Sequence, residues 1–107
     1  MFDPDGARQR LGLGESDFAR IFECIWSEVS ERRSLLEEAY LAGDLARVAL
    51  HAHTIKSCAA TIGAKHLSLA AAAVEREADA GCVEALDAAV TAFRVAKETL
   101  SKLLGLG

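Results

Sequence analysis

The sequence predicts an all-α protein, an up-down-up-down antiparallel four-helix bundle with a short N-terminal helical segment. Alanine and leucine dominate the composition and there is one proline, so local preference favours helix along nearly the whole chain. Apolar residues recur at steps of three and four in four successive blocks, which glycines separate. Because the connections are very short, successive helices are expected to lie antiparallel. With 107 residues, the chain suits one packed domain, residues 1–107.

The first block is the longest and has the pattern of a single amphipathic helix. It is expected to begin with Ser16 or Asp17 as its N-cap and to stop at Gly43. Its apolar residues follow helical spacing at Phe18, Ile21, Phe22, Ile25, Val29, Leu36 and Tyr40. Ahead of this helix, the segment from Pro4 to Leu13 is expected to add a short helix that covers one end of the bundle.

Three more helices are expected, each bounded by a cap or a glycine. Asp44 is predicted to cap the second helix, which ends at Gly63. The inward seam of this helix is formed by Leu45, Val48, Ala52, Ile55, Ala59 and Ile62. The third helix is expected over roughly 65–80, before Gly81, and the last block follows from Val83 onward.

Charge and hydropathy exclude several classes of protein. The 16 acidic and 12 basic residues give a net charge of -4, and no cluster of Lys or Arg forms the stripe that phosphate backbones require. Nucleic acid is therefore not an expected partner. No segment approaches the roughly 20 uninterrupted apolar residues of a membrane span, and the N-terminal region lacks the apolar core of a signal peptide. We therefore expect a cytoplasmic protein without membrane contact.

The three cysteines, Cys24, Cys58 and Cys82, are widely separated and lack any C-x-x-C spacing. This pattern argues against both a disulfide framework and a zinc knuckle. Because free cysteine is among the most buried residue types, we expect reduced and mostly buried thiols.

Two histidines lie two positions apart in the stretch HAHTIKSCAATIGAKHL, residues 51–67. At about 100° per residue, His53 lies about 130° from the inward seam of its helix, and His51 lies about 70° from it on the other flank. The rings therefore diverge, whereas chelation from one helix needs ligands at i and i+3 or i+4. Since His66 completes no tetrahedral set, we expect no metal site. His51 is expected to be a half-buried histidine at the border of the core.

His53 differs in its neighbours, which are mostly short. They are Ala46, Ala49, Lys56, Ser57 and Ala60. Lys56 is placed to attract an anionic group bonded to the ring nitrogen, and Ser57 to donate a hydrogen bond to that group. With an unperturbed pKa of about 6.5, an imidazole keeps a free lone pair at cell pH. The arrangement is typical of a nucleophile that accepts a phosphoryl group, and an ordinary solvated histidine is the alternative.

The positions of His53, Lys56, Ser57, Gly63 and Leu67 match a known pattern. With these residues, HTIKSCAATIGAKHL resembles the histidine-containing phosphotransfer (HPt) domain family of phosphorelays. Serine stands at position 57, where glycine is commonest in the family, and it keeps the site small. The resemblance implies a four-helix bundle whose exposed histidine exchanges phosphoryl groups with the aspartate of a receiver domain.

The resemblance also implies a role for each site residue. His53 is expected to accept and donate the phosphoryl group through Nε2, and Lys56 to steady its charge. Glu75 resembles a glutamate often found on the next helix of the family. Gly63 is expected to permit close packing or the break after its helix. The domain itself needs no cofactor, since Mg²⁺ belongs to the receiver, and the chain has no G-x-x-x-x-G-K-[ST] loop for autonomous kinase activity.

A partner that exchanges phosphoryl groups must approach His53 closely, and the small residues Ala49 and Ala60 are expected to permit this. The start of the first long helix carries more apolar surface than one seam needs, at Phe18, Ile21 and Phe22. Part of that surface is expected to form a docking patch, although core packing is the stronger expectation for each residue.

The expected partners are response-regulator receiver domains, a sensor histidine kinase, or both. One alternative is the phosphorylatable domain of a larger chemotaxis-type histidine kinase. A helical module that binds receivers or kinases without being phosphorylated is another, although the presence of His53 and Lys56 speaks against it. We expect a monomer, because transfer through a lone imidazole needs no dimer and only the first helix has a surplus apolar face.

Overall fold

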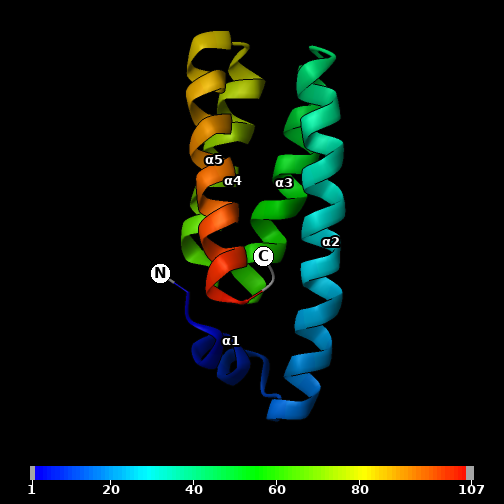
Figure 1. Ribbon diagram of the computed structural model, residues 1–107, viewed down its shortest axis with the longest axis vertical. Helices are drawn as coiled ribbons and strands as arrows, with labels where there is room; N and C mark the ends of the chain where they lie inside the picture. Colours follow the sequence, from blue (N-terminus) through cyan, green and yellow to red (C-terminus); the bar gives the residue numbers. More distant parts are fainter. Residues whose placement is uncertain (1, 106–107) are drawn as a thin grey trace.

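The computed structural model describes residues 2–105, so Met1 and residues 106–107 of the predicted domain lie outside the described part of the chain. The described residues form five helices: α1 (Pro4–Leu11), α2 (Glu15–Leu41), α3 (Leu45–Thr61), α4 (Lys65–Ala80) and α5 (Val83–Leu103). Helices α2 to α5 run alternately up and down, and α1 lies at the lower end of the bundle (Figure 1). The predicted fold class is confirmed.

The start of α3 agrees with the sequence, and the start of α2 does not. The Asp44 carboxylate accepts a hydrogen bond from the Arg47 amide at 3.2 Å, as an N-cap does. Helix α2 begins at Glu15, with Gly14 as its N-cap, so the prediction that Ser16 or Asp17 caps it is wrong. The carbonyl of Gly14 already accepts the first helical hydrogen bond, which draws both residues into the first turn.

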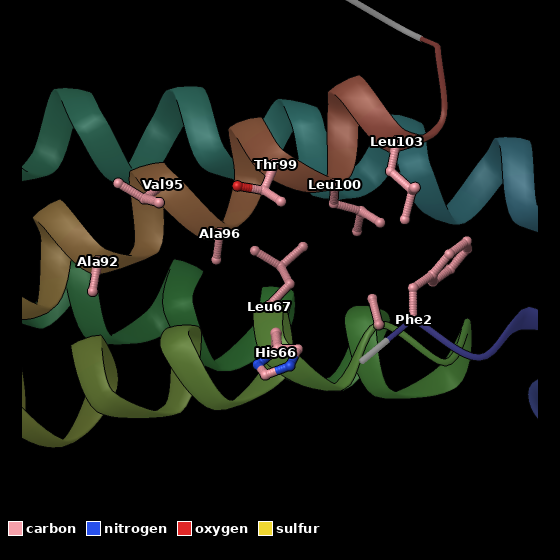
Figure 2. Close-up of a pocket in the computed structure, with 10 residues that line it drawn as sticks. Phe2, His66, Leu67, Ala92, Val95, Ala96, Thr99, Leu100 and Leu103 are labelled. Carbon is pink, nitrogen blue, oxygen red and sulfur yellow. The ribbon is translucent and has the colours of Figure 1, made fainter.

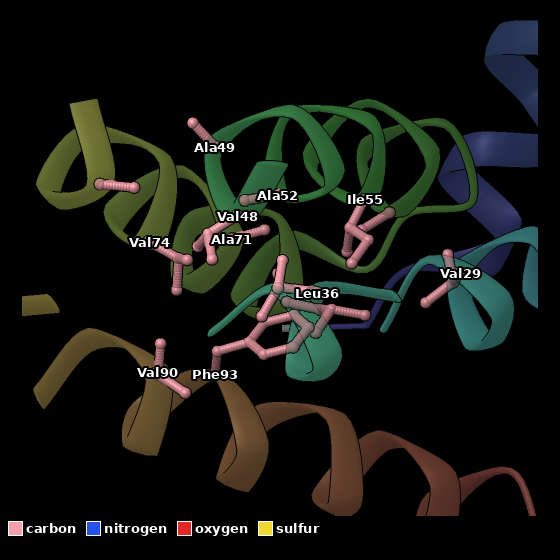
Figure 3. Packing of buried hydrophobic residues seen from close by; sticks show 14 of the residues in the cluster. Val29, Leu36, Val48, Ala49, Ala52, Ile55, Ala71, Val74, Val90 and Phe93 are labelled. Carbon is pink, nitrogen blue, oxygen red and sulfur yellow. The ribbon is translucent and has the colours of Figure 1, made fainter. Parts of the chain in front are cut away.

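The core lies between the four long helices, and its largest fully buried residues come from each of them (Figure 3). They are Phe93, Leu36, Ile55, Ile62, Leu67, Leu86, Val29, Val48, Val74 and Val90. The predicted seam of α3 is buried from Val48 to Ile62, and Leu45 is partly buried. Small residues of α3 and α4, such as Ala52, Ala59 and Ala71, are also fully buried, and short side chains of this kind allow close packing of helices.

Long polar side chains connect α2 with α5. The Arg94 guanidinium donates two hydrogen bonds to the Glu37 carboxylate, at 2.8 and 2.6 Å, and lies 5.5 Å from the centre of the Tyr40 ring. These hydrogen bonds hold the pKa of Glu37 below its ordinary value. Further along, the Lys97 ammonium lies 4.7 Å from the centre of the Trp26 ring. This side of the bundle is therefore held in part by charge and aromatic contacts.

The cysteines are less buried than the sequence suggested. Cys24 and Cys82 are exposed and only Cys58 is partly buried, so the prediction of mostly buried thiols is wrong. Cys82 is the N-cap of α5, in the short connection after α4. All three are free thiols, and burial raises the pKa of Cys58.

The N-terminal segment is fixed to the turn between α3 and α4. The Asp3 amide donates a hydrogen bond to the Gly63 carbonyl at 2.8 Å. Gly63 has a φ of +81°, and a Cβ at this position would overlap the Asp3 carbonyl. Glycine is therefore required here both by the left-handed backbone and by the close approach of a second chain segment. In the described residues, no helix is both long and apolar enough to cross a membrane.

Replacing Gly63 by alanine should destabilise the protein more than the same change at Gly43. Gly43 has a similar φ of +72°, but no atom lies within 4 Å of its added Cβ. Gly43→Ala should therefore lower the free energy of unfolding by about 1 kcal/mol. Gly63→Ala should lower it by a further ~2 kcal/mol, because the Asp3 backbone must move. Urea denaturation measures both values, and equal losses would show that the approach of Asp3 contributes nothing.

Candidate functional site

His53 lies in the middle of α3, on the side opposite the buried seam, and its side chain is 58% exposed. The helix places Ser57 and Ala60, both exposed, one and two turns further along the same face. The ring is therefore accessible among short side chains, as the sequence suggested. Its position also brings it to the edge of α3 that packs against α4, where Glu75 lies.

Glu75 of α4 contacts both His53 and Lys56 of α3. Nδ1 of His53 lies 2.8 Å from Oε2 of Glu75, and Nζ of Lys56 lies 2.9 Å from Oε1. The hydrogen bond from Lys56 and, with a smaller effect, that from His53 hold the pKa of the Glu75 carboxyl below its ordinary value, against desolvation, which raises it. At neutral pH, Glu75 is therefore a carboxylate with each oxygen assigned to one partner.

This contact selects the tautomer of His53. A carboxylate only accepts hydrogen bonds, so the proton of a neutral ring must sit on Nδ1 and is donated to Glu75. Nε2 then carries the lone pair, and among the described residues it has no hydrogen-bond partner. The arrangement leaves the outer nitrogen of an exposed imidazole available for bonding to an external group.

Lys56 is held at both its backbone and its side chain. The Ser68 hydroxyl of α4 donates a hydrogen bond to the Lys56 carbonyl at 2.9 Å, and the ammonium is paired with Glu75. The Lys56 side chain is 35% exposed. An anion bonded to His53 would therefore compete with Glu75 for this ammonium.

Ala49 does not belong to the exposed surface around His53. It is 8% exposed and forms part of the core cluster, so the expectation that it borders a partner is corrected. It lies on the flank of α3 that carries Lys56 and faces α4, where the neighbouring helix covers it. Leu50, three positions before His53 and 56% exposed, is an apolar candidate that sequence reasoning missed. Only its surplus of apolar surface outside the seam could have signalled it.

The aromatic start of α2 forms a cluster at the lower end of the bundle. The ring centre of Phe22 lies 6.0 Å from that of Phe18 and 6.0 Å from that of Phe2. Phe18 is 8% exposed and Phe22 is partly buried, so both contribute mainly to packing. Ile21, 37% exposed, is the member of the predicted docking patch that keeps substantial accessible surface.

His51 occupies the opposite environment to His53, because it is buried between α2 and α3. It is 8% exposed, more buried than the half-buried position expected from the sequence. Nη1 of Arg32 lies 3.2 Å from Nδ1 of His51, and arginine only donates, so Nδ1 is unprotonated and the ring is neutral. Burial lowers the pKa of His51, and the charges of Arg32 and Arg47 lower it further.

No group of three or more His, Cys, Asp or Glu side chains within residues 2–105 is arranged to hold a metal ion. The two histidines of HAHTIKS point to different helices: the His51 ring contacts Arg32 of α2, and the His53 ring contacts Glu75 of α4.

His51 should make stability depend on pH just below neutrality. Its lowered pKa means that the unfolded chain binds the proton more readily, so the stabilisation is complete above the unfolded value of 6.5. It is lost as pH falls from 6.5 through the lower folded value. His51→Gln should therefore flatten the decline of the unfolding free energy between about pH 7 and pH 5, measured by urea denaturation. His66→Gln, at an exposed histidine of α4, is the control, and an unchanged slope in His51→Gln would contradict the prediction.

Removing Glu75 should release the tautomer of His53. In the unaltered protein at neutral pH, the ¹⁵N chemical shifts of the neutral ring should report a proton on Nδ1, because Glu75 accepts it. In Glu75→Ala the signal should shift toward the tautomer protonated on Nε2. Glu77→Ala removes a neighbouring carboxylate that contacts Arg76 instead, and it should leave the His53 shifts in place. Identical shifts in all three proteins would exclude the Glu75 contact in solution.

Comparison with known proteins supports one family. The model of the Hpt domain matches residues 20–100, which include all of α3 and α4 and most of α2 and α5. No curated protein and no solved structure matched the chain. The match covers most of the bundle, together with His53, Lys56 and Glu75. The chain therefore belongs to the Hpt domain family, whose members interact with receiver domains and kinases and carry phosphoryl groups in phosphorelay signalling.

Proposed function

We propose that this protein is a histidine phosphotransfer intermediate of a two-component phosphorelay. His53 accepts a phosphoryl group from the aspartate of a receiver domain, or from a kinase, and passes it to another receiver. The observation that carries this proposal is the exposed His53 ring with its Nδ1 held by Glu75 at 2.8 Å, which leaves Nε2 as the nucleophile. Membership in the Hpt domain family supports the same reaction.

The transfer step follows from the protonation of the ring. The Nε2 lone pair attacks phosphorus, the N–P bond forms, and the O–P bond to the donor aspartate breaks, which returns that residue to a carboxylate. Since the proton stays on Nδ1, the ring gains positive charge as the bond forms. The Glu75 carboxylate, already bonded to Nδ1, offsets that charge. The reverse sequence hands the group to the next receiver.

Lys56 and Ser57 act on the phosphoryl group in this proposal. The Lys56 ammonium, one turn from His53, turns from Glu75 to the phosphoryl oxygens once they are present. Before transfer, the ammonium lies 2.9 Å from Oε1 of Glu75, the residue that also contacts His53, so the Lys56 side chain needs little reorientation. The exposed Ser57 hydroxyl supplies a further donor. The Mg²⁺ that assists transfer belongs to the partner receiver and not to this chain.

The docking surface is proposed to surround His53 on the outer side of α3. The small exposed residues Ser57 and Ala60 let a receiver bring its aspartate within bonding distance, and Leu50 supplies an apolar contact. Ile21 is the part of the predicted patch on α2 that keeps accessible surface for a partner.

The cytoplasmic location expected from the sequence stays a prediction.

Phosphoryl transfer from a panel of phosphorylated receiver domains tests the proposal. The unaltered protein should gain an acid-labile, alkali-stable label, and His53→Gln should lose essentially all of it, because no other residue takes its place. His66→Gln, at an exposed histidine, and His51→Gln, at the buried one, should both keep the label. Circular dichroism confirms that each variant is folded.

If no receiver labels the folded protein, the phosphotransfer proposal is wrong, and a module that binds receivers without being phosphorylated becomes the better account. Label that persists in His53→Gln but disappears in another variant would move the acceptor away from the site described above.

A further inference from the structure

A groove of about 310 Å³ lies between α4 and α5, with Phe2 at one end (Figure 2). The short side chains of Ala92 and Ala96 of α5 form part of its lining. Val95 and Leu103 also line it and are 60% and 68% exposed. Of the described residues that line this groove, only His66 is ionisable. Thr99 is the other polar side chain among these lining residues, so the surface of the groove is mainly apolar.

This surface is a second apolar face of α5. The first face packs in the core through Leu86, Val90, Phe93 and Leu100. The second runs along the helix at steps of four, three, four and four residues, through Ala88, Ala92, Val95, Thr99 and Leu103. All five are exposed, and none is charged. An unpartnered seam of this kind is the pattern of a helix that packs against another helix.

The charges of α5 indicate which helix fits this seam. Glu84 lies in the first turn and Lys102 in the last, where Lys102 also pairs with Glu98 of its own helix at 3.2 Å. This pair is exposed, so the Lys102 ammonium stays accessible to a second carboxylate. In an antiparallel pair of α5 helices, Glu84 of each copy faces Lys102 of the other. The same register centres the contact on position 93, which brings the small Ala92 of one copy within one position of the larger Val95 of the other. Both copies contribute the same residues to this contact, as a two-fold interface requires.

We propose that a second copy of this chain occupies the groove, with the two α5 helices packed antiparallel in a two-fold dimer. In the centre of this interface, uncharged side chains of one copy contact those of the other, and an ion pair between Glu84 and Lys102 forms at each end. The sequence suggested a monomer because only the first helix had a surplus apolar face, and the exposed seam of α5 removes that reason. His53 and Lys56 of α3 meet Glu75 on the side of α4 that faces α3, away from the groove, so the dimer leaves both His53 sites accessible.

Sedimentation equilibrium over a range of protein concentrations tests the dimer, with a matched pair of substitutions on α5. Val95 and Val83 are both 60% exposed, but only Val95 lines the groove. Val95→Glu should weaken dimerisation more than about tenfold, because it places a carboxylate in the centre of an apolar contact. Val83→Glu should leave the dissociation constant unchanged. Circular dichroism shows whether both variants keep their helices.

A charge exchange tests the antiparallel register independently of the groove. Glu84→Lys and Lys102→Glu should each weaken the dimer, since each sets like charges opposite one another, and the double variant should recover most of the affinity. Recovery in the double variant supports the register, and its absence contradicts it.

Three results would overturn the proposal: an unaltered protein that stays monomeric at every concentration, equal effects of Val95→Glu and Val83→Glu, or loss of receiver-dependent labelling of His53 in a monomeric Val95→Glu variant. The last result would assign the groove to a receiver domain.

Discussion

The close packing of α3 against α4 is the contact on which the site depends. Ala52 and Ala59 of α3 and Ala71 of α4 are fully buried in the core, and short side chains of this kind let packed helices approach closely. This approach lets Glu75 of α4 reach both His53 and Lys56 of α3. A larger residue in this contact would separate the helices and lengthen both hydrogen bonds. The chemistry of the exposed face is therefore supported by the small residues beneath it.

The two histidines of α3 show how position on one helix decides chemistry. His51 is 8% exposed and accepts a hydrogen bond from Arg32, which requires a neutral ring. His53 donates from the equivalent nitrogen, Nδ1, to a carboxylate. The opposite roles of Nδ1 leave the proton on different nitrogens in the two rings. One histidine joins two helices, and the other keeps a free nitrogen for an external group.

The four sides of the bundle are held by different interactions. Apolar contacts dominate between α3 and its neighbours, whereas Arg94, Glu37 and Tyr40 connect α5 with α2 through long polar side chains. Polar contacts of this kind are individually weak and sensitive to salt. On another side of α5, an apolar seam remains exposed among residues 2–105. Helix α5 therefore combines a polar connection to α2 with an exposed apolar seam on another side.

The sequence by itself determined the helices, their order, and the direction in which most residues face. Helical periodicity and the caps and glycines at their ends depend on residues close together in the chain, so the seam of α3, the cap at Asp44 and the exposure of His53 were all predictable. The start of α2 was not, because the backbone of Gly14 rather than a side chain caps it.

Only the tertiary structure decided which surfaces meet. Ala49 is buried on the flank of α3 that faces α4, whereas Cys24 and Cys82 are exposed. Glu75 reaches His53 across 22 positions of sequence. The family pattern suggested Glu75, but its two hydrogen bonds depend on the distance and rotation between two helices. Those quantities arise from packing over the whole interface, and no local pattern in the sequence contains them.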